Sequence, residues 1–216
     1  FTWENIEVKG RGKQDLTSYD LVICGNPEAE ALAKECNPHT TLMLQVGVDT
    51  DHFQSRPNVT RDTLVAYVGR PAQEKGLPYL AEAWPGVKVL DWKDFRDLPW
   101  WYSSLQVIVA YSQDVPGWKE QAPNYVVLEA LSCGCKAIIS DTAAMKFWLE
   151  GCPGVVIVEG HEQLSDELHL ERIIKLRQGV EEALTRSIGE GGREWVVDHF
   201  SNPVIANKLL QVLEHA

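Results

Sequence analysis

The sequence predicts an α/β fold in which a parallel sheet carries helices on both faces. Short apolar runs alternate along the chain with longer amphipathic segments, which is the pattern of successive βαβ units. Some of the runs, such as residues 137–139, are apolar without alternation, as expected for parallel strands covered on both sides. In sheets of this kind ligands bind at the carboxyl ends of the strands, so the loops there are the candidate sites.

Length, charge and cysteine usage limit the class of protein. The 216 residues, 44% of them hydrophobic, suffice for one full domain plus a fragment. The net charge is -11, so a nucleic-acid partner is not expected. No apolar run approaches membrane-spanning length. The five cysteines are an odd number and lie in or beside apolar segments, which favours reduced thiols and a cytoplasmic location.

The sequence shows no metal-ligand pattern. Cys133 and Cys135 have no second pair at zinc spacing, and the six histidines are not spaced as ligands. We therefore expect no metal site, and we interpret the cysteine pair as a core junction between a helix and a strand.

The first 46 residues predict a small βαβ piece. Strands are expected at residues 19–24 and 41–46, and Asn26 is expected to cap the helix between them, with Pro27 at its first position. The glycine-spaced segment at residues 10–15 begins like a dinucleotide fingerprint, but no strand precedes it and the third glycine is missing.

The rest of the chain predicts a main, Rossmann-like domain and a helical tail. Strands are expected at residues 64–68, 87–90, 105–110, 136–140 and 155–158. Helices are then expected at residues 169–186, 193–200 and 203–215, the last capped by Ser201 or Asn202.

The loop after the first strand of the main domain carries two cations. Gly69 and Arg70 follow the strand, Pro71 keeps Arg70 out of the helical region, and Lys75 lies at or just before the next helix. The forked donors of arginine and the point charge of lysine suit a diphosphate that gains charge as it leaves. Taken alone, this loop would fit a solvated first turn with two ordinary basic residues as well.

Residues 116–141 predict a loop, an amphipathic helix and a buried strand. Asn124 begins the helix as an N-cap, and Gly134 ends it. Its apolar face comprises Val127, Leu128 and Leu131. Glu129 lies on the other face. Free N–H groups at a helix start and a carboxylate one to two turns inside suit the phosphates and hydroxyls of a nucleotide.

Aromatic residues lie near two other strands. Asp91 and Trp92 follow the second strand of the main domain, where a planar base could lie against backbone and aromatic surface. Trp100, Trp101 and Tyr102 precede the third strand at helical spacing. We expect these three to pack in the core or at its rim rather than to form a site.

Four segments together carry a family resemblance. They are GVDTDHF, VAYVGRPAQEKGLPYLAEA, LPWWYSSLQVIVAYSQ and APNYVVLEALSCGCKAIISD. In this order and spacing they resemble the successive signatures of the C-terminal, donor-binding domain of family 4 (group 1) retaining glycosyltransferases with the GT-B fold. The resemblance runs from about residue 19 to the C-terminal helix, and each segment alone would be a weak signal.

The resemblance implies a division of the chain. Residues 1–46 would be a remnant of the N-terminal acceptor domain, 47–62 an interdomain linker, 63–200 the nucleotide-sugar donor-binding domain and 201–216 the helix that crosses back. Because the chain starts at Phe1 with only part of an acceptor domain, we expect that the rest was left out or comes from another polypeptide. A donor-binding half alone should bind nucleotide but transfer sugar very poorly. Any membrane association would come through the absent domain.

The resemblance also implies roles for single residues. Arg70 and Lys75 match the basic pair that grips the donor diphosphate. Glu129 matches the second glutamate of the paired-glutamate motif, whose carboxylate accepts hydrogen bonds from the ribose hydroxyls. Backbone N–H groups around Tyr125 and Val126 would meet the phosphates. The implied donor-binding set is Gly69, Arg70, Lys75, Asn124, Tyr125, Val126 and Glu129, with Asp91 and Trp92 on the side of the base.

The first glutamate of the motif should lie eight residues before Glu129, where the chain has Gln121. Glu120 is one residue away. A one-residue insertion in this loop would let Glu120 reach the sugar. We favour this interpretation, in which Glu120 is the residue beside the sugar. Otherwise Gln121 offers hydrogen bonds but not the full negative charge that an oxocarbenium-like transition state needs.

By resemblance, the chain is expected to transfer a hexosyl group from a nucleotide-diphosphate sugar to an unidentified glycan, lipid or small-molecule acceptor. Neither a metal ion nor a cofactor is expected. One alternative, favoured by Gln121, is a non-catalytic nucleotide-sugar-binding or interaction module of the same fold. Another is an unrelated doubly wound protein such as a nicotinamide enzyme, for which a usable GxGxxG is missing.

Overall fold

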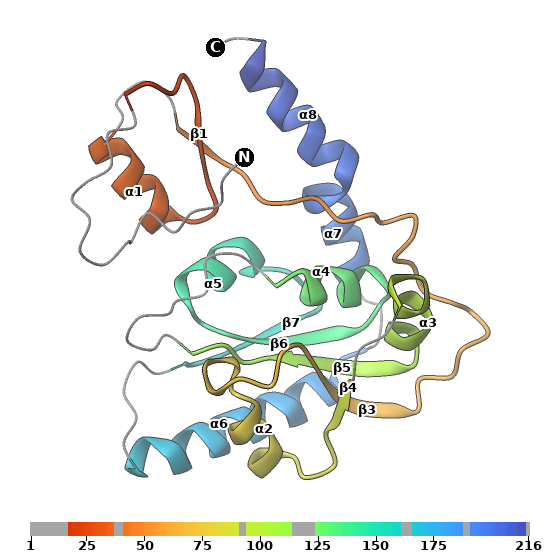
Figure 1. The fold of residues 1–216 in the computed structure, drawn as a ribbon. Coiled ribbons are helices and arrows are strands. Elements are labelled where there is room, and N and C mark those ends of the chain that lie inside the picture. Colours follow the sequence, from red (N-terminus) through yellow and green to blue (C-terminus); the bar gives the residue numbers. More distant parts are fainter. Residues whose placement is uncertain are drawn as a thin grey trace.

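The computed structural model describes residues 17–36, 41–90, 94–113, 124–160, 166–187 and 191–214. Its centre is a five-stranded parallel sheet in the order β4-β3-β5-β6-β7. The strands are β3 (Thr63–Val68), β4 (Lys88–Leu90), β5 (Leu105–Ala110), β6 (Lys136–Ser140) and β7 (Val155–Val158). Helices cover both faces of this sheet (Figure 1). The predicted α/β fold with a Rossmann-like parallel sheet is therefore confirmed.

The helices of the main domain divide between two hydrophobic cores. They are α2 (Leu77–Ala83), α3 (Leu98–Ser103), α4 (Tyr125–Ser132), α5 (Ala143–Leu149) and α6 (Asp166–Thr185), with 3-10 turns η1 (Gln73–Lys75) and η2 (Phe95–Asp97). One core lies between the sheet and α3, α4 and α5, and the other between the sheet and α2 and α6. Strand β6 is buried along its whole length between them, which explains why its sequence does not alternate.

The N-terminal segment forms the predicted βαβ piece. Parallel strands β1 (Val22–Cys24) and β2 (Thr41–Met43) flank helix α1 (Pro27–Cys36). Asn26 Oδ1 accepts a hydrogen bond from the N–H of Ala29 at 2.9 Å, which confirms the predicted N-cap. Both strands are shorter than predicted because the ladder runs only from the pair Val22 and Thr41 to the pair Cys24 and Met43.

Two helices complete the tail, α7 (Gly192–Phe200) and α8 (Asn202–Leu213). The N-cap position of α8 is Ser201, one of the two predicted residues, although its side chain makes no capping hydrogen bond. Residues 47–62 run from β2 to β3 and are tied to this tail. The N–H of Val48 donates to Phe200 O at 2.8 Å, and the N–H of Asn202 donates to Val48 O at 3.0 Å.

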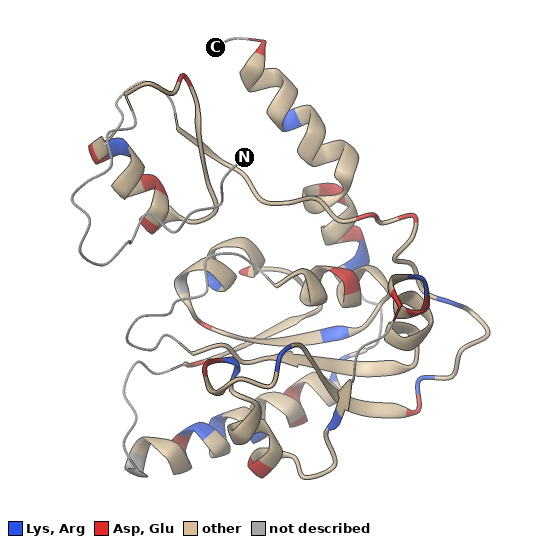
Figure 2. Cartoon of the chain, viewed as in Figure 1, with Lys and Arg blue, Asp and Glu red and all other residues tan. Residues whose placement is uncertain are grey.

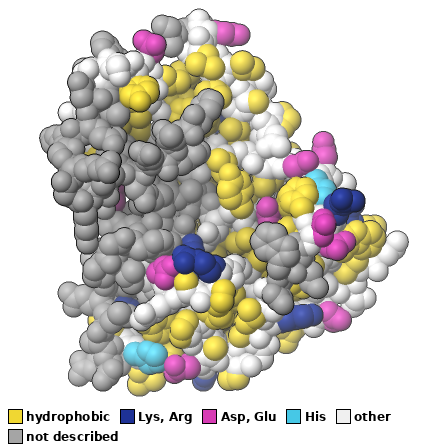
Figure 3. Space-filling view, in the orientation of Figure 1, with side chains coloured by type: hydrophobic (Ala, Val, Ile, Leu, Met, Phe, Trp, Pro, Cys, Tyr) yellow, Lys and Arg dark blue, Asp and Glu magenta, His cyan; other side chains and the backbone are white. Residues whose placement is uncertain are grey.

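Helix α8 differs from α6, the other long helix, in the polarity of its surface. Leu210 and Leu213 are more than half exposed, and no residue of α8 is fully buried. Figure 2 shows charges of both signs along α6 but very few on α8. Hydrophobic side chains gather in the upper part of the view in Figure 3, where Figure 1 places α8. Within the described part of the chain, no helix combines the length and the apolar character needed to cross a membrane.

Candidate functional site at the carboxyl edge of the sheet

The loops that follow β3 and β5 are in direct contact at the carboxyl edge of the sheet. The N–H of Gln113 donates to Glu74 O at 2.7 Å. Gly76 lies so close to the second loop that a Cβ atom there would be 2.1 Å from Tyr111 O. Because neighbouring parallel strands end at the same edge, these two loops form one continuous surface.

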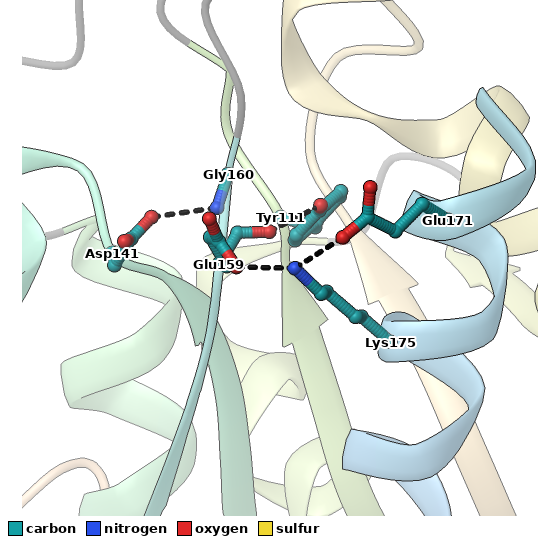
Figure 4. Close-up of polar contacts among 6 residues, drawn as sticks. All are labelled: Tyr111, Asp141, Glu159, Gly160, Glu171 and Lys175. Atoms are coloured by element: carbon teal, nitrogen blue, oxygen red, sulfur yellow. Dashed lines mark hydrogen bonds and ion pairs between the residues drawn. The ribbon is translucent and has the colours of Figure 1, made fainter. Parts of the chain in front are cut away.

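The loops after β6 and β7 join the same surface (Figure 4). The Tyr111 hydroxyl donates to Glu159 O at 2.6 Å, and the N–H of Gly160 donates to Asp141 Oδ1 at 2.6 Å. The carboxylate of Glu159 pairs with Lys175 of α6. The four loops at this edge are therefore held to one another and to α6 by direct polar contacts.

This edge also holds buried polar atoms that are not satisfied. Among the described residues, Gln113 Oε1, Ser140 Oγ and Thr142 Oγ1 have no hydrogen-bond partner, although each of the three residues is buried. All three lie at or just beyond the carboxyl ends of β5 and β6. Since unpaired buried polar atoms are costly, these atoms are available to bind a polar ligand or water.

The predicted cations lie together in the first of these loops. Gly69 directly follows β3 and has φ 137°. The Tyr67 hydroxyl fixes the next residue by donating to Arg70 O at 2.6 Å. The guanidinium of Arg70 is 67% exposed and pairs with Glu74 at 2.6 Å. Lys75 ends η1. An exposed ion pair of this type contributes only about 0–1 kcal/mol, so it holds the Arg70 side chain only weakly.

The helix start predicted at Asn124 is present, with one difference. Asn124 occupies the N-cap position of α4, but its side chain makes no capping hydrogen bond. Tyr125 is 52% exposed and Val126 is half-buried. A first helical turn has N–H groups without partners in the helix, and here the N-cap side chain does not satisfy them. The predicted apolar face is buried, as Val127, Leu128 and Leu131 are each 0% exposed.

Glu129 on α4 is half-buried, and its carboxylate has a hydrogen-bond partner within the chain. Its Oε2 accepts a hydrogen bond from the Tyr102 hydroxyl of α3 at 2.8 Å. Burial raises the pKa of Glu129, while the bond from Tyr102 and the charge of nearby His52 oppose that rise. The His52 ring stacks on Phe95 with centroids 4.4 Å apart. The carboxylate therefore lies where α3, α4 and the segment before β3 meet.

Tyr102 is the residue near the site that sequence reasoning missed. It packs in the core at 0% exposure, as expected, but its hydroxyl also holds Glu129. This contact joins residues on two helices that are 27 positions apart. Such a contact depends on how the helices pack, and no local sequence pattern reveals it.

Several predicted residues lie outside the described part of the chain. These are Asp91, Trp92, Glu120 and Gln121, together with the glycine-spaced segment at residues 10–15. The sugar-side and base-side roles therefore remain predictions.

The described residues include all five cysteines and several other potential metal ligands. Within them, no three His, Cys, Asp or Glu side chains are grouped so that they could hold a metal ion. All five cysteines are free thiols. Cys135 lies in the predicted junction between helix and strand, where its thiol donates to Tyr102 O at 2.8 Å and burial raises its pKa to about 12. A thiol with this pKa is not an active nucleophile.

The raised pKa of Glu129 gives a stability prediction. A carboxyl whose pKa is higher in the folded than in the unfolded chain stabilises the fold below its ordinary pKa, and this contribution is lost as the pH rises through the folded value. At pH 7, Glu129→Gln should therefore raise the melting temperature above that of the wild type. The gain should shrink as the pH falls toward the ordinary pKa of a carboxyl group.

Melting curves of Glu129→Gln at pH 7 and pH 4 check this prediction. Glu181→Gln on the exposed side of α6 removes the same charge and is the matched control. A lower melting temperature for Glu129→Gln than for this control at pH 7 would contradict the stated effect of burial.

Comparisons with known proteins identify the fold of the chain through solved structures. No protein-family model matches the chain, and no curated protein matches its sequence. Among solved structures, the chain is similar to sucrose-phosphate synthase from Thermosynechococcus elongatus, with a TM-score of 0.72 and 21% identity over 93% of this chain and 59% of that chain. It is also similar to HepE from Anabaena in complex with UDP and glucose, with a TM-score of 0.71 and 13% identity over 93% of this chain and 64% of that chain.

A third structure corresponds to a single domain. It is the C-terminal domain of a glycosyl transferase group 1 family protein, LpcC, from Francisella tularensis, with a TM-score of 0.54 and 17% identity. The match covers 72% of this chain and 100% of that one. The chain spans less than two thirds of the sucrose-phosphate synthase and HepE chains. At these identities the likeness shows that the chain has the fold of GT-B glycosyltransferase domains.

Proposed function

We propose that the chain is the donor-binding part of a metal-independent, retaining family 4 glycosyltransferase that transfers a hexosyl group from a nucleotide-diphosphate sugar. The observation that supports this proposal most directly is the hydrogen bond from the N–H of Gln113 to Glu74 O at 2.7 Å, which holds the loop with Arg70 and Lys75 against the end of β5, the strand that precedes α4. The fold supports it, as do the similar HepE structures in complex with UDP or UDP-glucose. A cytoplasmic location is part of the same proposal and rests on the free cysteines.

The mechanism follows from where charge develops. When the bond between the anomeric carbon and the diphosphate breaks, negative charge builds on the leaving oxygen. Arg70 and Lys75, together with the N–H groups of Tyr125 and Val126 at the positive end of α4, would stabilise that charge. Protein cations thus supply the stabilisation that a divalent ion supplies elsewhere.

The remaining roles concern the ribose and the sugar. Glu129 would accept hydrogen bonds from the ribose hydroxyls. The buried oxygens of Gln113, Ser140 and Thr142 lie at the carboxyl ends of β5 and β6. Glu120 or Gln121 would lie beside the transferred sugar. The acceptor would bind to a domain of which residues 1–46 are a part, with residues 47–62 as linker, 63–200 as donor domain and 201–216 returning to that domain.

Calorimetry with UDP, GDP, ADP and the matching nucleosides tests the proposal. We expect one nucleoside diphosphate to bind at least tenfold more tightly than its nucleoside, because the diphosphate meets both cations and a helix start. Lys75→Ala should weaken this binding about tenfold, corresponding to a loss of ~1.4 kcal/mol.

The control for the charge change is Lys208→Ala, which removes an exposed lysine on α8 and should leave the affinity unchanged. If none of the three diphosphates binds at millimolar concentration, the proposal fails. If nucleotide binds but the full-length protein transfers no sugar, the non-catalytic module suggested by Gln121 replaces it.

A further inference from the structure

Ring packing and one hydrogen bond hold the Tyr102 side chain in one position in the core. Its ring lies against Phe53, with centroids 6.1 Å apart, and against Trp101, with centroids 5.6 Å apart. Tyr102 is 0% exposed, so its ring is packed within the core. Its hydroxyl donates to Glu129 Oε2 at 2.8 Å. The direction from which Glu129 meets this donor is therefore set by the packing of α3 against α4.

The hydroxyl also has a fixed protonation state. Burial and the adjacent charge of Glu129 raise the pKa of Tyr102 far above its ordinary value, so the phenol is protonated at neutral pH. A neutral phenol next to a carboxylate donates its one proton. Oε2 accepts this hydrogen bond, and Oε1, which has no hydrogen bond among the described residues, remains to accept one from a ligand.

A packing role alone does not require this hydroxyl. A phenylalanine ring would fill the same space, and a buried hydroxyl is costly unless it is bonded. What the hydroxyl adds is orientation, because a carboxylate held at one oxygen presents the other in a defined direction. Holding a functional carboxylate by a neighbour on a rigid helix is how binding sites keep their geometry.

We propose that Tyr102 is a positioning residue that orients Glu129 toward the ribose, so that the site selects ribonucleoside diphosphates over 2′,3′-dideoxy ones. This inference rests on the proposed function. It assigns the selectivity to a pair of residues on α3 and α4 rather than to Glu129 alone. Two other groups face the carboxylate, namely His52 before β3 and Tyr125 on the same helix.

The test compares two affinities in the full chain. UDP, GDP and ADP are each titrated against wild type and Tyr102→Phe, alongside their 2′,3′-dideoxy counterparts. We expect wild type to prefer the ribonucleotide about 10–100-fold, the range for a hydrogen bond to a charged group. Tyr102→Phe should reduce this preference about fivefold or more through weaker ribonucleotide binding, with dideoxynucleotide binding unchanged.

Controls separate this inference from the proposed function. Glu129→Gln and the double variant complete a cycle, and we expect the two losses not to add, because both act on one contact. Tyr79→Phe removes a hydroxyl that bonds Arg172 on the other side of the sheet and should leave the preference unchanged. If Tyr102→Phe does not fold, the wild-type Tyr102 hydroxyl proton is followed by NMR and should shift with ribonucleotide but not with dideoxynucleotide.

The possible results distinguish failure of the proposed function from failure of the proposed role of Tyr102. Failure of all three diphosphates to bind wild type overturns the proposed function and this inference with it. Binding of a diphosphate without preference for the ribose, or a preference that Tyr102→Phe retains in full, overturns the role of Tyr102 and leaves the donor site in place. An NMR signal that responds equally to both nucleotides does the same.

Discussion

Gly76→Ala should lower the melting temperature by about 10 °C and abolish nucleotide binding. Gly76 has φ 68°, and a Cβ atom there would be 2.1 Å from Tyr111 O. Tyr111 O belongs to the backbone of the loop after β5, so it cannot rotate away as a side-chain atom could. The left-handed conformation costs about 1–2 kcal/mol for a residue other than glycine, and overpacking adds about 1–3 kcal/mol. At roughly 2–4 °C per kcal/mol, the sum gives the expected shift.

Binding should fail because Gly76 joins the loop with Arg70 and Lys75 to the rest of the carboxyl edge. Melting curves and calorimetry measure the two effects. Gly86→Ala is the matched control, since its Cβ would meet nothing nearer than 3.8 Å and no positive φ opposes it. Equal stability and equal affinity of the two variants would show that the close contact between the loops is not required.

Arg193→Ala should destabilise the chain by about 3–5 kcal/mol. The Arg193 guanidinium, at the start of α7, donates to Ser132 O at 2.6 Å, Phe53 O at 2.9 Å and Thr50 O at 3.1 Å. It thereby ties the end of α4 to the segment before β3. Hydrogen bonds to charged groups contribute about 1.5–3 kcal/mol each, and three carbonyl oxygens would lose a partner together.

Urea denaturation measures this effect. Arg96→Ala is the control, because the Arg96 side chain is 89% exposed and faces Asp94 only at 3.8 Å. We expect the control to change stability by less than about 0.5 kcal/mol. An Arg193→Ala midpoint that matches the control would mean that the segment before β3 is held by other contacts.

The sequence was sufficient to predict the fold because the signals are local. Apolar runs without alternation, such as β6, and the cap at Asn26 each reflect the chain within a few residues. The order of the strands and the convergence of their carboxyl ends then follow from the rules for parallel sheets. Strand limits were less accurate at β1, where pairing with a short partner decides where the ladder ends.

The site could be predicted only in part. The loop with Arg70 and Lys75 and the start of α4 follow from residues that are adjacent in sequence. The pairing of Arg70 with Glu74 and the bond from Tyr102 to Glu129 do not, because side-chain partners depend on rotamers and on helix packing. The absence of a capping bond at Asn124 is a further example, since residue type predicts the position of a cap and not the bond itself.

A crystal structure of the chain with UDP, or with the nucleoside diphosphate that binds best in calorimetry, tests the central claim most directly. We predict phosphates between the loop of Arg70 and Lys75 and the first turn of α4, with the ribose within hydrogen-bond distance of Glu129 Oε1. A nucleotide bound elsewhere on the chain, away from the carboxyl edge of the sheet, would contradict the account.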